Sequence, residues 1–243
     1  METTVSEIGD RIFRFSTCIP EVAPGGFTFN QFLVDGDQPL LFHTGMRALF
    51  PLVSEAVKTV MPLECLRWIS FGHVEADECG AINQWLAAAP RAQVVHSKLA
   101  CDVSVRDLID RPPMVLEDGG ILDAGSRRFR LIQTPHAPHN WEAIVLFEEG
   151  SRTLLCGDIL TATGDGPALT KSDPVERVLG AERMFKAWSL APGTTDVLRG
   201  LATLNPTTLA AMHGSSFEGD GGRVLLDLAA GLGAIAAGRV RPG

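Results

Sequence analysis

A dense group of metal-ligand side chains follows a short apolar stretch near residue 70. Residues 66–71 are mostly apolar and predict a strand, which Gly72 ends. The chain then places four side chains that can bind metals close together: His73, Glu75, Asp77 and Glu78. Buried side by side without a cation, these groups would repel one another and lose their hydration. The sequence therefore predicts a metal site at the end of a strand, with ligands enough for two ions.

Short strands and helices alternate along the chain in two blocks. Strands are expected at residues 11–17, 27–34, 39–42, 65–71, 93–96, 115–116, 121–122, 128–133, 143–147, 153–156 and 209–212. Helices are expected at residues 46–60, 78–88, 175–188, 195–204 and 222–239. Neither a linker nor a repeat interrupts this pattern, so we expect a single domain over residues 1–243. Two strand-rich blocks, each followed by helices, predict the α/β class and an αβ/βα four-layer sandwich of two mixed β-sheets flanked by helices.

Charge and composition exclude several classes of protein. The net charge of −8 argues against nucleic acid or an anionic membrane as the main partner. No apolar run reaches the roughly 18 residues of a membrane span, and the first residues lack the pattern of a signal peptide. Five cysteines without a Cys-x-x-Cys pair fit a reducing compartment. We therefore expect a cytoplasmic protein that does not bind nucleic acid or membrane.

Ligand-type residues also follow three later strands. His136 and His139 both come after the strand at 128–133, Asp158 comes after the strand at 153–156, and His213 comes after the last expected strand, at 209–212. Sites are commonly assembled from loops at strand ends, because a rigid sheet holds the loops in place. We therefore expect these residues to converge with the group at residues 73–78.

The order of these residues resembles the metallo-β-lactamase fold superfamily over residues 27–213. The resemblance lies in a His-x-Glu-x-Asp series, a later His, a Gly-Asp and a final His-Gly. Residues 40–45 resemble the superfamily's early Asp-Thr-Gly turn, with His43 in place of the usual Asp. The superfamily's hydrolases usually carry His where this chain has Glu75. The fold that this resemblance implies is the one that the strand and helix pattern predicts.

Glu75 and two sequence intervals resemble one branch of the superfamily, the diiron domain of flavodiiron and oxygen-binding diiron proteins. Asp77 and His139 are 62 residues apart, and His139 and Asp158 are 19 apart. This resemblance implies one iron on His73, Glu75 and His139, and a second on Asp77 and His213, with Asp158 bridging both. It also implies a homodimer.

Several positions leave alternatives open. The diiron family carries His where this chain has Glu78, so Glu78 either coordinates a metal or is an exposed carboxylate in the first turn of the next helix. His139 is favoured as the third histidine, although the longer spacing of hydrolases would suit His136. If His139 binds the metal, we expect His136 either to donate a hydrogen bond to a metal ligand or to line the pocket. We expect Trp141 to line the pocket, and His43 either to support a ligand or to be a buried structural histidine.

The donor set favours iron over zinc or manganese. Three imidazoles and three or four carboxylates suit ions that accept octahedral geometry better than tetrahedral zinc. With all four carboxylates bound, their charge would balance two divalent cations, which eases oxidation of iron and makes bound water less acidic. The sequence thus favours redox chemistry at two metal ions over hydrolysis.

Three functions follow in order of preference. The first is a non-haem diiron oxidoreductase or oxygen-binding protein that binds or reduces O₂ or NO. Its electrons would come from a separate partner protein, because the chain shows no flavodoxin-like domain and no FMN site. The second is a metallohydrolase acting on an ester, lactone, thioester or phosphodiester. The third, a binding module with a structural metal, is disfavoured because six or seven ligands exceed what such a site needs.

Overall fold

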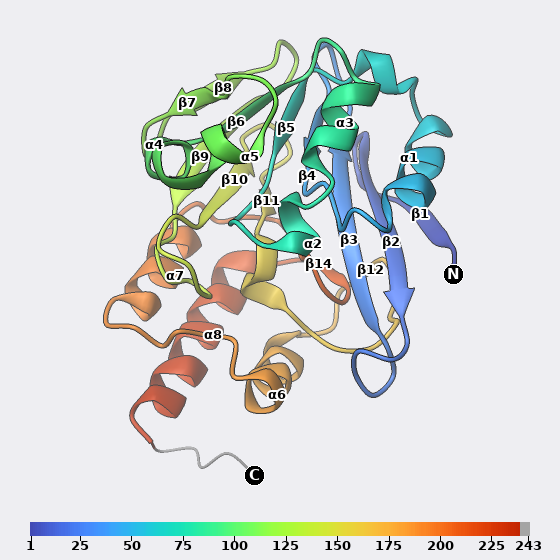
Figure 1. Ribbon diagram of the computed structural model, residues 1–243. Helices are drawn as coiled ribbons and strands as arrows, with labels where there is room; N and C mark the ends of the chain where they lie inside the picture. The colour runs from blue at the N-terminus through green and yellow to red at the C-terminus, as the bar shows by residue number, and fades with distance from the viewer. Residues whose placement is uncertain (239–243) are drawn as a thin grey trace.

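The structure is a computed structural model that describes residues 1–238, and two seven-stranded sheets form its centre (Figure 1). The first sheet follows the order of the chain: β1 (Thr3–Gly9), β2 (Ile12–Ile19), β3 (Phe27–Val34), β4 (Leu40–Phe42), β5 (Trp68–Ser70), β6 (Gln93–Ser97) and β7 (Met114–Leu116). Strands β1 to β4 pair antiparallel, and β4 to β7 pair parallel. All eight residues of β3 are buried, because both faces of this strand are covered.

The second sheet holds the strands of the C-terminal half in a rearranged order. Across the sheet they are β12 (Leu169–Thr170), β14 (Ser216–Glu218), β13 (Thr208–Ala210), β11 (Thr153–Leu155), β10 (Ile144–Glu148), β9 (Arg128–Gln133) and β8 (Ile121–Asp123). Strands β11 and β13 pair parallel, although more than 50 residues separate them in the chain. This pairing places the loops that follow β11 and β13 at the same edge of the sheet.

Helices cover the outer face of each sheet. The longer ones are α1 (Phe50–Lys58), α3 (Ile82–Ala88), α6 (Val175–Phe185), α7 (Thr194–Ala202) and α8 (Gly221–Ala236). Shorter helical turns are η1 (Leu63–Cys65), α2 (Ala76–Cys79), α4 (Lys98–Ala100), η2 (Cys101–Val105), α5 (Arg106–Leu108) and η3 (Gly157–Leu160). Figure 1 shows α1 and α3 on one flank and α6, α7 and α8 on the other.

Three apolar clusters correspond to the contacts between these layers. One joins the first sheet to α1 and α3, through residues such as Leu33, Val53 and Trp85. Another fills the space between the sheets, and the third joins the second sheet to α6, α7 and α8. The expected four-layer αβ/βα sandwich with two mixed sheets is confirmed.

Some elements differ from the sequence-based expectation. Strands β1, β12 and β14 and the helical turns at 98–108 were not expected, because their sequences are polar or too short to show a period. The expected helix at 78–88 is divided into α2 and α3. The division occurs because Ala81 N donates to Gly45 O, outside the helix, instead of continuing the helical ladder. Helix α8 ends at Ala236, and Arg239 of the expected helix lies outside the described residues.

Among residues 1–238, every helix is too short or too polar to span a bilayer.

Candidate metal centre

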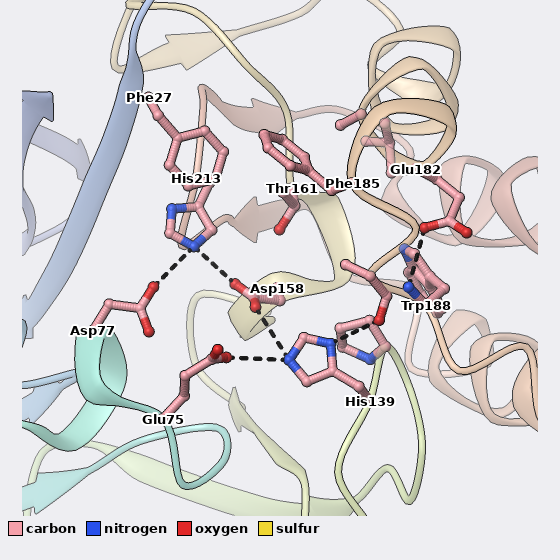
Figure 2. A pocket seen from close by; sticks show the side chains of 14 residues that line it. Phe27, Glu75, Asp77, His139, Asp158, Thr161, Glu182, Phe185, Trp188 and His213 are labelled. Atoms are coloured by element: carbon pink, nitrogen blue, oxygen red, sulfur yellow. Dashed lines mark hydrogen bonds and ion pairs between the residues drawn. The ribbon is translucent and has the colours of Figure 1, made fainter. Parts of the chain in front are cut away.

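The candidate site is built from loops that follow four strands of the two sheets. The loop after β5 in the first sheet provides the group at residues 73–78 and leads into α2. The second sheet provides His139 after β9, Asp158 in η3 after β11, and His213 between β13 and β14. Figure 2 shows side chains from these loops pointing toward one another, and several of them line one cavity. The expected convergence of segments far apart in the chain is therefore present in the structure.

The first half of the cluster contains His73, Glu75 and His139. The Oε2 atom of Glu75 lies 2.8 Å from Nε2 of His73 and 3.2 Å from Nε2 of His139. The two imidazole Nε2 atoms are 2.8 Å apart. Together with Asp158, these residues bring one ligand atom each to within 4.8 Å of all the others.

The second half of the cluster contains Asp77 and His213. The Nε2 atom of His213 lies 3.3 Å from Oδ2 of Asp77 and 3.2 Å from Oδ1 of Asp158. The other oxygen of Asp158, Oδ2, lies 3.8 Å from Nε2 of His139 and 3.9 Å from Nε2 of His73. Asp158 thus directs one oxygen toward each half of the cluster (Figure 2).

Hydrogen bonds on the far side of the rings orient two of the histidines. Nδ1 of His139 donates to Ala187 O over 3.0 Å, and Nδ1 of His213 donates to Thr28 O over 2.7 Å. A carbonyl oxygen only accepts, so Nδ1 carries a proton in both rings. Each ring therefore directs Nε2, the nitrogen that can bind a metal, into the cluster.

The convergent atoms fit a bound cation. Two nitrogen ligands at right angles, each roughly 2.1 Å from one ion, are about 3 Å apart, which is close to the separation of the His73 and His139 Nε2 atoms. The buried oxygens Oδ1 of Asp77 and Oδ1 of Asp158 accept no hydrogen bond from the described residues. Buried acceptors without donors are costly unless a cation compensates them. The donor set is chemically that of a two-ion site.

Protons on the imidazoles offset the carboxylate charges. Burial opposes a charged His213, but the carboxylates of Asp158 and Asp77 outweigh burial and raise the pKa of His213 to about 10. Burial likewise opposes a charged His73, while the charge of Glu78 and the hydrogen bond with Glu75 raise its pKa well above the ordinary value. Hydrogen bonds from His139 and His73 lower the pKa of Glu75 to about 2. A cation bound here would replace the imidazole protons.

Glu78 lies outside this convergence. Its side chain is fully buried and contacts His73 and His43, but it does not line the cavity. The alternative of an exposed carboxylate is therefore wrong, because α2 turns this residue inward. His43 is also fully buried, at the end of β4, with Nδ1 3.3 Å from Asn30 O.

Two expected pocket residues lie elsewhere. His136 is exposed and does not line the cavity, because the tight turn closed by its N–H donating to Asn140 O leaves its side chain outside. Trp141 is 56% exposed and also does not line the cavity, although Asn140 beside it reaches toward Val74 O. The expectation that these two side chains form the pocket is wrong.

The cavity above the cluster has a volume of about 230 Å³ and mostly apolar walls. Phe27 stacks on the ring of His213, with centroids 4.2 Å apart. Phe185 of α6 packs edge-on against Phe27, with ring centroids 5.5 Å apart, and Trp188 after α6 also lines the cavity (Figure 2). The helical period of residues 175–188 indicated a buried face, and the helices after residues 164–173 were expected to cover the pocket; the structure places α6 beside the candidate ligands.

Comparison with protein families gives a match over most of the chain. The model of the family described as ODP family beta lactamase matches residues 27–214. Two curated relatives are named diflavin flavoprotein A 2, from Synechocystis sp., and diflavin flavoprotein A 1, from Thermosynechococcus vestitus. Each is 28% identical to this chain, over 137 and 141 residues, which are 55% and 56% of this chain. The matches cover 23% and 24% of the relatives, so the chain spans about a quarter of the length of these relatives.

Solved structures show the same fold. Rubredoxin oxygen:oxidoreductase from Desulfovibrio gigas matches with a TM-score of 0.82 at 19% identity, over 93% of this chain and 62% of that chain. A variant of the flavo di-iron protein from Thermotoga maritima matches with a TM-score of 0.82 at 17% identity, over 98% of this chain and 63% of that chain. The similarity extends to nearly all of the described residues.

Proposed function

The chain belongs to the family described as ODP family beta lactamase, and from this premise we propose that it is a diiron protein that binds or reduces O₂ or NO. The observation that carries the proposal is the convergence of three imidazole Nε2 atoms with carboxylates from two sheets. The family and the names of its relatives support this function over the metallohydrolase alternative.

The chain's own residues would hold the two ions in different ways. His73, Glu75 and His139 would hold the first ion, and Asp77 and His213 the second, with Asp158 between them. Two iron ions bound there would supply the redox capacity and the free coordination positions that O₂ or NO requires. Because the Nδ1 protons of His139 and His213 are held by backbone carbonyls, these rings need no reorientation when a metal binds.

Charge supports iron over zinc. Three carboxylates, Glu75, Asp77 and Asp158, converge on the cluster, and Glu78 adds a fourth from behind His73. Such an acidic set balances the charge of two divalent ions and eases their oxidation, whereas it makes bound water a weaker acid for hydrolysis.

The cavity walls suit a small uncharged ligand. Phe27, Phe185 and Trp188 present apolar surface to the space above the cluster. Apolar walls exclude water and leave the electrostatic interactions of the ligands unscreened. O₂ and NO are small and apolar, so they can enter such a cavity without loss of strong hydration.

The proposed redox chemistry needs a source of electrons. We propose that electrons reach the ions from a separate donor protein. The relative from D. gigas is named as an oxidoreductase for rubredoxin and oxygen, which supports this proposal. The single domain over residues 1–243, the homodimer and the cytoplasmic location stay predictions.

Metal analysis of protein purified without oxygen tests the proposal. We expect about two iron ions per chain and a change in visible absorption when O₂ or NO is added, because the residues that would hold both ions line or adjoin the cavity. Protein that retains zinc alone, and whose iron-loaded form gives no spectral response to either gas, would contradict the proposal. Hydrolysis of a panel of esters and lactones by the zinc form, lost in Asp158→Ala, would instead identify a hydrolase.

A further inference from the structure

Glu78 contacts His73 at two points, both away from the cavity. Its Oε2 atom accepts a hydrogen bond of 2.6 Å from His73 N. Its Oε1 atom lies 3.3 Å from Nδ1 of the same residue and 3.4 Å from Nε2 of His43. One buried carboxylate thus contacts the backbone and ring of a histidine that belongs to the metal cluster, and also a histidine outside the cluster.

We propose that Glu78 is a positioning residue of the metal centre and not one of its ligands, and that His43 holds Glu78 in place. The inference rests on the proposed metal function. A carboxylate only accepts hydrogen bonds, so its place beside Nδ1 of His73 favours a proton on that nitrogen. Nε2 of His73 then keeps its lone pair for a metal, as in the two histidines whose Nδ1 atoms face carbonyls.

Two glycines make room for this carboxylate. A Cβ atom added to Gly72 would lie 2.9 Å from Oε2 of Glu78, and one added to Gly157 would lie 3.3 Å from Oε1. Gly157 also has a φ of +50°, which other residues rarely adopt. The carboxylate therefore occupies a buried niche between the loop after β5 and η3.

The backbone ties His43 to the same niche. Thr44 donates to the carbonyl oxygen of Glu78 twice, from its backbone N over 2.6 Å and from its hydroxyl over 3.1 Å. His43 itself has a φ of +66°, a costly conformation for a residue with a side chain, so the surrounding contacts must hold it there. Its Nδ1 lies 3.3 Å from Asn30 O, and its Nε2 contacts Oε1 of Glu78 at 3.4 Å without forming a hydrogen bond.

The sequence supports a link between the two positions. His43 and Glu78 are the places where the chain departs from the families that it resembles, which carry an acid and a histidine there, respectively. In this chain the two side chains contact each other at a distance of 3.4 Å. One imidazole and one carboxylate are thus kept in the niche behind His73.

Glu78→Gln tests the positioning role with little change in shape. We expect the variant still to bind two ferrous ions at saturation, but with an affinity for one of them about 10- to 100-fold lower, because an amide has one acceptor oxygen and cannot present an acceptor to both His73 N and Nδ1 of His73. Titration with Fe²⁺ against a coloured chelator under anaerobic conditions measures both quantities. The matched control is Glu142→Gln, since Glu142 is a buried carboxylate that accepts from Val74 N without contacting an imidazole.

Two results would overturn the proposal. A saturated Glu78→Gln protein with one ion would show that Glu78 is a ligand, and an unchanged affinity would show that it does not position His73. A wild-type chain that binds no iron would overturn the proposed function as well, so the two failures can be told apart.

A double-mutant cycle tests the role of His43. Asn tolerates the left-handed backbone at this position, so His43→Asn should fold. If His43 acts through Glu78, the double variant His43→Asn with Glu78→Gln should lose no more affinity than Glu78→Gln alone. Losses that multiply would show that His43 acts independently. Urea unfolding of the metal-free variants checks that changed affinity does not merely reflect lost stability.

Discussion

The two halves of the cluster differ in ligand number and in burial. The first half has three residues of its own, but Glu75 is 53% exposed and His139 24% exposed. The second half has only Asp77 and His213, yet His213 is 4% exposed and packs against Phe27 and Phe29. If both halves bind metal as proposed, the first half would gain affinity from the number of its ligands, and the second from rigid placement. We therefore expect substitutions in the first half to change mainly the iron content, and substitutions in the second half to lower the free energy of unfolding as well.

The largest effect is expected at the residue that the halves share. Asp158→Ala should lower the iron content from about two ions per chain to well below one, because each oxygen of Asp158 faces one half of the cluster. Metal analysis after desalting measures this loss. Asp107→Ala, an exposed carboxylate on α5, is the matched control and should retain both ions. If Asp158→Ala still bound two ions, Asp158 could not be a ligand shared by the two halves.

A pair of histidines in one loop tests the first half. His139→Ala should lose one ion and keep about one, because only the first half loses a ligand. His136→Asn, three residues earlier and exposed, should keep both ions, and asparagine suits the positive φ of this position. The iron content and iron affinity of both variants show which of the two histidines binds the metal. Loss of iron in His136→Asn alone would reverse the assignment.

A smaller effect on stability should mark the second half. In the metal-free protein, His213→Ala should lower the free energy of unfolding by about 1–3 kcal/mol, because a buried ring loses its packing and its hydrogen bond to Thr28 O. Glu75→Ala should change it by less than ~0.5 kcal/mol, as expected for a half-exposed side chain. Urea unfolding of both variants measures the difference. Equal losses would contradict the contrast in burial.

The smallest effect is expected at Trp141. Trp141→Ala should leave iron content unchanged and alter the free energy of unfolding by less than ~0.5 kcal/mol, since the side chain is 56% exposed. Trp188→Ala is the contrast, because this buried side chain lines the cavity, and its loss should cost about 3 kcal/mol. A spectral response to O₂ that changes more in Trp141→Ala than in Trp188→Ala would restore Trp141 to the pocket.

Most of the fold could be predicted from the sequence, because strands such as β3 and β9 have strong apolar patterns of their own. Strand β14 could not, since its three residues show no period and its place depends on pairing with β13. The division of the helix at 78–88 likewise depends on a hydrogen bond from Ala81 N to a distant loop. Elements are thus predictable where local pattern decides them, and not where remote contacts do.

The sequence by itself determined the fold class and predicted which residues converge at the candidate metal centre, because each candidate ligand lies in a loop after an apolar strand that a sheet must bury. Only the tertiary structure decided where each side chain points. Ala187 O orients His139 into the cluster while His136 remains outside, and two glycines and His43 enclose Glu78 behind His73. The physical reason is that the direction of a loop side chain depends on hydrogen bonds and space provided by segments far away in the chain.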